Sequence, residues 1–114
     1  MKIVKNSISI NELKAMSGKM FGKLVKAVVD IELQIMAIDA ELHVDLESIL
    51  LDSESEQSNL WGINIHPDYS SNQEFVEFDS MINIRPAIGN RSRYVENPQV
   101  REKIISIVAN LVQR

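Results

Sequence analysis

The sequence predicts an α+β domain of two layers, in which a mainly antiparallel sheet carries an N-terminal and a C-terminal helix on one face. Apolar residues recur at helical spacing near both ends of the 114-residue chain and alternate with polar ones between them. The composition, 45% hydrophobic and 25% charged, is typical of a globular protein and excludes wholesale disorder, collagen-like repeats and a membrane-embedded body. Because this length suits one compact unit, we assign residues 1–114 to a single domain.

The first helix is predicted from its start signal. Ser9 and Glu12 have the S-x-x-E spacing of a capping box, in which each side chain binds a free backbone N–H at the helix end. Gly22 is suited to end the helix. One apolar stripe is formed by Leu13, Met16 and Met20.

The last helix is predicted from Asn97, a good N-cap, and from Pro98, which suits the first helical position. Its apolar face comprises Val100, Ile104, Ile107 and Leu111. Both helices are therefore amphipathic and able to cover a sheet.

Four segments between the helices alternate with a period of two and are predicted strands: 25–31, 36–43, 61–66 and 76–85. Strict alternation predicts an antiparallel sheet with one packed and one polar face. Segment 44–52 stays open between a helical turn capped by Asp45 and the start of a hairpin that returns over 59–65. Residues 53–58 and 67–73 are predicted loops.

Charge is distributed unevenly along the chain, although the net charge is only -4. Residues 1–26 hold six Lys and one Glu, residues 27–84 hold thirteen Asp or Glu and no Lys or Arg, and residues 85–114 hold six basic and two acidic residues. We interpret this pattern largely as complementarity inside the fold. The N-terminal lysines lack interleaved aromatic residues and the pI is near 5.1, which argues against a dedicated nucleic-acid binder.

Several function classes are excluded by what the sequence lacks. Without cysteine there is no disulfide, thiolate zinc site or cysteine nucleophile. Four glycines do not form a phosphate-binding or dinucleotide-binding turn. No apolar run is long enough for a signal peptide or a membrane span, so we expect a cytoplasmic protein with no membrane partner.

The first candidate site is acidic. At strand spacing, Asp39, Glu41 and His43 project from one face, and Asp79 has the same polar parity on the later strand. Such a set suits a divalent metal or an acid–base pair with an orienting carboxylate. The alternative is a solvated sheet face with Asp45 as a helix cap, and we favour it, so a divalent metal cofactor is not favoured.

The second candidate site lies at the connection from Pro86 to Glu96. Arginine forks, free loop amides and a hydroxyl suit bidentate binding of a phosphate or carboxylate. The predicted anion-binding residues are Arg85, Asn90, Arg91, Ser92 and Arg93. Alternatively, the arginines neutralise Glu77, Asp79 or Asp39 on neighbouring strands, and this internal pairing is the reading we favour.

Four strings taken together resemble a family of short uncharacterised prokaryotic proteins that is known as a domain of unknown function. The strings are ELHVDLE (41–47), NLWGINIHP (59–67), EFDSMINIRP (77–86) and GNRSR (89–93). The resemblance covers most of the chain and implies one complete domain. It implies no activity, cofactor or catalytic residue.

The leading hypothesis is a small cytoplasmic binding or regulatory module. Its polar sheet face and Arg-rich loop would contact an anionic small molecule or a protein partner. The alternative is a metal-assisted hydrolase or related enzyme that uses Asp39, Glu41 and His43. A second alternative is a structural domain whose acidic face docks a basic partner or a second copy of the chain. The sequence leaves open whether the acidic strands and the Arg loop share one pocket.

Overall fold

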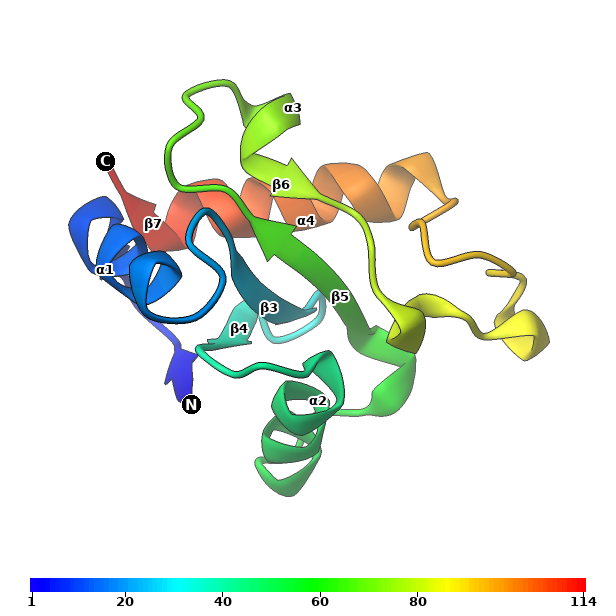
Figure 1. Cartoon of the computed structure of the whole chain (residues 1–114). Helices are drawn as coiled ribbons and strands as arrows, with labels where there is room; N and C mark the ends of the chain where they lie inside the picture. The colour runs from blue at the N-terminus through cyan, green and yellow to red at the C-terminus, as the bar shows by residue number, and fades with distance from the viewer.

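The structure is a computed structural model that describes the backbone of residues 1–114 and every side chain except those of residues 72 and 73 (Figure 1). The helices are α1 (Ile10–Met20), α2 (His43–Asp52), α3 (Asn72–Phe75) and α4 (Pro98–Leu111). The strands are β1 (Lys2–Val4), β2 (Ile8–Ser9), β3 (Val25–Asp30), β4 (Ile35–Ile38), β5 (Leu60–Ile65), β6 (Val76–Glu77) and β7 (Val112–Gln113). Short 3-10 turns are η1 (Gln57–Asn59), η2 (Met81–Asn83) and η3 (Pro86–Ile88). In the part of the chain that the structure describes, no helix is both long and apolar enough to cross a membrane.

A five-stranded antiparallel sheet with the order β1-β4-β3-β5-β6 forms the middle of the molecule. A separate parallel pair joins β2 to β7, with Ile8 opposite Val112. The predicted α+β class is confirmed, and so are the central strands at residues 25–31 and 61–66.

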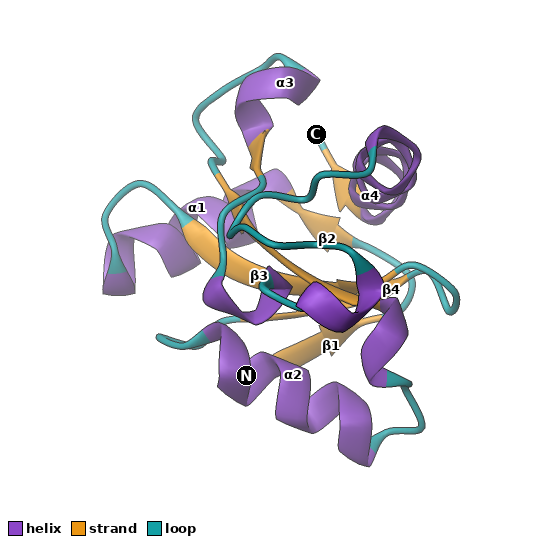
Figure 2. Cartoon of the chain, turned by 90° about the vertical axis from the view of Figure 1, so that its right-hand side faces the viewer, coloured by secondary structure: helices purple, strands orange, loops and turns teal.

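One face of the sheet packs against α1 and α4, as predicted (Figure 2). Leu13 of α1 and Ile104 of α4 are fully buried against strand residues such as Ile63. Both N-cap residues act as predicted, but only the Ser9 half of the predicted capping box forms, because the Glu12 carboxylate accepts from the Lys2 Nζ at 2.7 Å instead. The Ser9 hydroxyl accepts the Glu12 N–H at 3.1 Å, and the Asn97 side chain accepts the N–H groups of the residues that follow Pro98.

The opposite face of the sheet is covered by α2, which corrects the expectation of a polar, solvated face (Figure 2). Leu46 and Leu50 of α2 are fully buried against Val28, Ala37 and Leu60. Leu46 and Leu50 lie four residues apart, so they share one side of a helix. Segment 44–52 is therefore a helix, and the central strands are buried on both faces.

The predicted long strand over 76–85 is also wrong, because β6 ends at Glu77. Beyond it, side chains bond to the edge of β5. The Asn83 carboxamide accepts the Gly62 N–H at 2.8 Å and donates to the Gly62 carbonyl at 3.0 Å. The Arg85 guanidinium donates to the Leu60 carbonyl at 2.7 Å. These two side chains satisfy backbone groups that a neighbouring strand would otherwise pair.

Candidate functional site

The predicted acidic set does not share a strand face, because β4 ends at Ile38. Asp39 follows with a left-handed φ of 74° and turns the chain away from the sheet. Glu41 is exposed in the turn, whereas His43 begins α2 and is buried. Side chains at every second position share a face only where the backbone is extended. The shared face from which a metal or acid–base set was predicted is therefore not formed at these positions. Among the side chains that the structure describes, no three His, Asp or Glu residues gather to hold a metal ion.

His43 has a structural contact instead. Its Nε2 lies 2.7 Å from the carbonyl of Ile63 and, because a carbonyl only accepts, carries the proton. Burial lowers the pKa of His43, and the hydrogen bond to Ile63 only partly opposes this effect. The charge of Lys26 lowers the pKa further. A buried, neutral imidazole therefore joins α2 to β5.

The predicted anion-binding loop does hold an anion, but the anion belongs to the chain. The Glu96 carboxylate accepts the N–H of Arg91 at 2.9 Å, the N–H of Ser92 at 2.8 Å and the Ser92 hydroxyl at 2.7 Å, all on Oε2. Free amides and a hydroxyl thus bind a carboxylate, which is the chemistry that the sequence indicates. The carboxylate belongs to Glu96, which lies five residues after Arg91 in the same loop.

Asn90 organises this loop from inside. Its Nδ2 lies within 3.0 Å of the carbonyls of Asn83, Ser92 and Tyr94, and its Oδ1 accepts the Glu96 N–H at 2.9 Å. The side chain is buried. Asn90 therefore holds the loop together, and its carboxamide is not free for a ligand.

The arginines of the predicted anion site are dispersed. Arg93 forms an ion pair with Asp79, with Nε 2.6 Å from Oδ1, in agreement with internal pairing. Arg85 donates to backbone carbonyls and lies over the Trp61 ring at 4.3 Å from its centroid. Burial lowers the pKa of Arg85. Arg91 is exposed on the loop.

The Glu96 contacts predict a pH-dependent contribution to stability. Hydrogen bonds from the Ser92 hydroxyl and the Arg91 N–H lower the pKa of Glu96 below its ordinary value of 4.5. A lowered pKa in the folded state means that this contribution is present above the ordinary value and is lost as pH falls through the folded value. Glu96→Gln should lower the Tm by a few degrees at pH 7, and this difference should vanish in acid.

Thermal melts of the wild type and Glu96→Gln from pH 7 to pH 2 check this expectation. The matched control is Glu41→Gln, because Glu41 is exposed in the turn before α2. A Tm difference for Glu96→Gln that stays constant across the whole pH range would contradict the carboxylate contacts.

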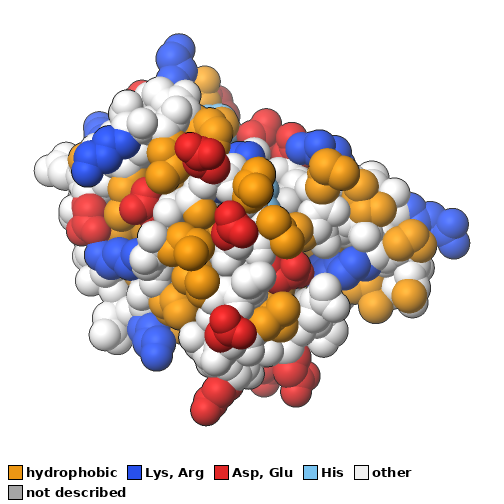
Figure 3. Space-filling model, turned by 60° about the horizontal axis from the view of Figure 1, so that its bottom comes forward, with side chains coloured by type: hydrophobic (Ala, Val, Ile, Leu, Met, Phe, Trp, Pro, Cys, Tyr) orange, Lys and Arg blue, Asp and Glu red, His pale blue; other side chains and the backbone are white. Residues whose placement is uncertain are grey.

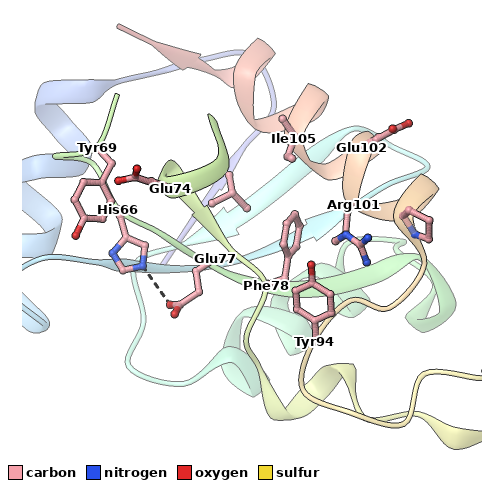
Figure 4. A pocket seen from close by; sticks show the side chains of 11 residues that line it. His66, Tyr69, Glu74, Glu77, Phe78, Tyr94, Arg101, Glu102 and Ile105 are labelled. Atoms are coloured by element: carbon pink, nitrogen blue, oxygen red, sulfur yellow. Dashed lines mark hydrogen bonds and ion pairs between the residues drawn. The ribbon is translucent and has the colours of Figure 1, made fainter. Parts of the chain in front are cut away.

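A groove lies between β6 and α4 and was not foreseen from the sequence (Figure 4). Its volume is about 830 Å³. It is lined by His66, Tyr69, Glu74, Val76, Glu77, Phe78, Tyr94, Pro98, Arg101, Glu102 and Ile105. The groove is therefore built from two stretches of the chain, 66–78 and 94–105.

Aromatic side chains form one end of the groove. Phe78 and Tyr94 meet edge to face, with ring centroids 6.0 Å apart. The Arg101 guanidinium lies 4.9 Å from the centroid of Tyr94 and donates to the carbonyls of Val95 and Glu96. Arg101 is thus held against the wall of the groove, while Tyr94 remains 48% exposed. A half-exposed aromatic ring beside a fixed cation is typical of a binding surface.

The other end of the groove is acidic. Figure 4 places Glu74 and Glu77 near His66 and Tyr69. The Oε1 of Glu77 accepts a hydrogen bond from the Asn64 Nδ2 at 2.9 Å and lies 3.2 Å from the His66 Nε2. The only sequence signal for this site is the position of Tyr69 and Tyr94 in segments without helical or strand periodicity.

Comparison with known proteins gives one match. A family model described as "Protein of unknown function (DUF5674)" matches residues 2–111. No curated protein and no solved structure matches the chain.

Proposed function

Because the chain belongs to the DUF5674 family of proteins of unknown function, we propose a function from its own surface: residues 1–114 form a binding domain that docks an extended segment of a partner protein. The segment lies in the groove between β6 and α4. A cytoplasmic location remains part of this proposal, and a chain without cysteine suits it.

The observation that carries the proposal is the pair of half-exposed aromatic side chains, Tyr69 and Tyr94, that line the groove beside the edge strand of the sheet. β6 is the last strand in the sheet order, so one edge of β6 pairs with β5 and its other edge has no neighbouring strand in the sheet. The His66 N–H donates to the Phe75 carbonyl at 2.8 Å, and Ile65 faces Val76 in the next pair. Hydrogen-bonded and non-bonded pairs alternate in an antiparallel ladder, so the Val76 carbonyl points away from β5. Val76 is only 3% exposed, so this short edge is covered and the segment is expected to bind through side-chain contacts with the aromatic residues of the groove.

The groove is also a surface that internal contacts leave accessible, unlike the two predicted sites. The sheet face predicted to be polar is covered by α2, and Glu96 occupies the amides of the Arg loop. By contrast, Tyr69 and Tyr94 at the groove are each about half exposed, at 49% and 48%. Aromatic residues of this kind supply much of the energy of protein–protein contacts.

Selection of peptides from a random library displayed on phage, with the full chain immobilised, tests the proposal. We expect an enriched consensus. The ¹⁵N NMR shifts caused by a selected peptide should concentrate at residues 76–78 and at Tyr94. Failure to enrich any peptide, or shifts confined to another face, would overturn the proposal.

Tyr94→Ala should lower the affinity for the selected peptide about tenfold, which is the loss expected of an aromatic contact worth about 1.4 kcal/mol. Phe21→Ala is the matched control, because Phe21 is a 41% exposed aromatic residue at the end of α1 and outside the groove. Equal affinities for both variants would place the binding site elsewhere.

A further inference from the structure

We infer that the segment bound in the groove is basic, with a Lys or Arg side chain at the acidic end and an apolar or aromatic side chain at the Phe78–Tyr94 end. This inference rests on the proposed function and specifies its ligand.

The acidic end is prepared for a cation. Asn64 and His66 contact Oε1 of Glu77, which fixes the carboxylate, and no side chain that the structure describes donates to its Oε2. The Glu77 side chain is 49% exposed, so Oε2 is accessible. A carboxylate held by its neighbours loses little conformational freedom when it binds a second partner.

Two further groups at this end favour a cation. Glu74 adds a second exposed carboxylate from α3, and Tyr69 adds a half-exposed ring (Figure 4). Carboxylates and an aromatic face are the groups that bind ammonium and guanidinium side chains. At the other end, the charges of Arg101 and Glu102 are opposite, so the rings of Phe78 and Tyr94 favour an apolar side chain there. The acidic end therefore specifies the charge of the segment.

The net charge of the molecule, -4, has the sign that attracts a basic partner. The expected complementarity inside the fold is limited, because among the described residues the ion pairs between fixed charges are Lys2–Glu12 and Arg93–Asp79. Only the Arg93–Asp79 pair joins a basic terminal block to the acidic block 27–84. Acidic side chains also spread over the face that carries α2, on the opposite side of the sheet from α4 and the groove (Figure 3). These carboxylates favour the approach of a basic partner, whereas recognition in the groove depends on Glu74 and Glu77.

The library selection described above separates this inference from the proposed function. We expect Lys or Arg to be enriched at one peptide position and apolar residues at another. Peptides that bind in the groove without any basic enrichment would overturn the inference and leave the proposed function standing. If no peptide binds, both fail.

A charge-deletion cycle gives the sharper test. The probe is the selected peptide, paired with a copy in which norleucine replaces its Lys or methionine replaces its Arg. The double variant Glu74→Gln/Glu77→Gln should bind the basic peptide about tenfold more weakly and the neutral copy with unchanged affinity. The matched control is Glu41→Gln/Glu56→Gln, which removes two exposed carboxylates of the same acidic block outside the groove.

Salt provides an independent readout. The affinity of the basic peptide should fall as NaCl is raised from 50 to 500 mM, because the ions screen exposed charges (Debye length about 10 Å at 0.1 M). The neutral copy should respond little. Equal losses of both peptides in the double variant, or equal salt responses, would show that the carboxylates do not recognise a cation.

Discussion

Asn83→Ala is expected to lower the free energy of unfolding by about 3 kcal/mol, which corresponds to a fall in Tm of about 10 °C for a chain of this size. The Asn83 side chain is fully buried. Alanine removes the partners of both the Gly62 N–H and the Gly62 carbonyl, and also the hydrogen bond to the Arg93 carbonyl at 2.9 Å. A buried backbone group without a partner costs about 1–3 kcal/mol, and three groups are affected.

Urea unfolding followed by circular dichroism measures this loss. Asn110→Ala is the matched control, because Asn110 is exposed on α4 and alanine is favourable in a helix. The control should be as stable as the wild type or slightly more so. A loss below 1 kcal/mol for Asn83→Ala would mean that the Asn83 side chain is not the partner of the β5 edge.

Gly62→Ala should be similarly damaging, with an expected loss of about 2–4 kcal/mol. A Cβ atom at position 62 would lie 2.5 Å from the Ser80 Cβ, 2.6 Å from its Oγ and 3.0 Å from Cγ1 of Ile82. Ser80 cannot move aside easily, because it is fully buried and its N–H donates to the Arg93 carbonyl at 3.2 Å. The extra methyl group therefore forces β5 and residues 80–83 apart, and the hydrogen bonds of Asn83 lengthen.

Replacing glycine by alanine at position 18 should change the free energy of unfolding in the opposite direction. Gly18 lies inside α1 with no neighbouring atom within 4 Å of an added Cβ, so Gly18→Ala should stabilise the protein by about 0.5–1 kcal/mol through helix propensity. In the Gly62→Ala background, Ser80→Gly removes the atoms that clash and should restore part of the loss. Additive effects of Gly62→Ala and Ser80→Gly would disprove this contact.

The parts of the fold that depend on local signals could be predicted from the sequence. Ser9 and Asn97 cap the helices that they were expected to begin, because a cap involves only the next three residues. The resemblance to a domain of unknown function is confirmed by the family match over residues 2–111. Strands β3 and β5 lie where the alternating pattern predicts strands, because every second residue of each strand packs into the core under α1 and α4.

The errors arise where a tertiary contact overrides the local pattern. Residues 36–43 alternate, but the left-handed Asp39 ends the strand and His43 starts a helix. Residues 76–85 also alternate, yet Asn83 and Arg85 turn their side chains to the edge of β5. In both segments, polar residues that suit a solvated strand face bond to buried carbonyls. Periodicity does not distinguish these two uses of a polar side chain.

For the candidate sites too, the sequence indicated local groups but not the tertiary contacts that they make. The sequence identified loop groups that bind a carboxylate, but it did not indicate that Glu96 is the carboxylate, because the loop conformation that brings it close depends on Asn90. The groove combines residues of α3, β6, the 94–98 segment and α4, and no spacing rule connects them. Two tyrosines outside the periodic segments were its only sign.

The pairing of β2 with β7 has a consequence for the rate of folding. Ile8 meets Val112, so this ladder joins positions near the two ends of the chain. Contacts between residues so distant in sequence form slowly, because loop-closure entropy is lost before the pairing can offset it. The antiparallel neighbours β3 and β4 are close in sequence and are able to associate early. We therefore expect the β2–β7 ladder to form late, after the sheet and its helices have brought the two ends together.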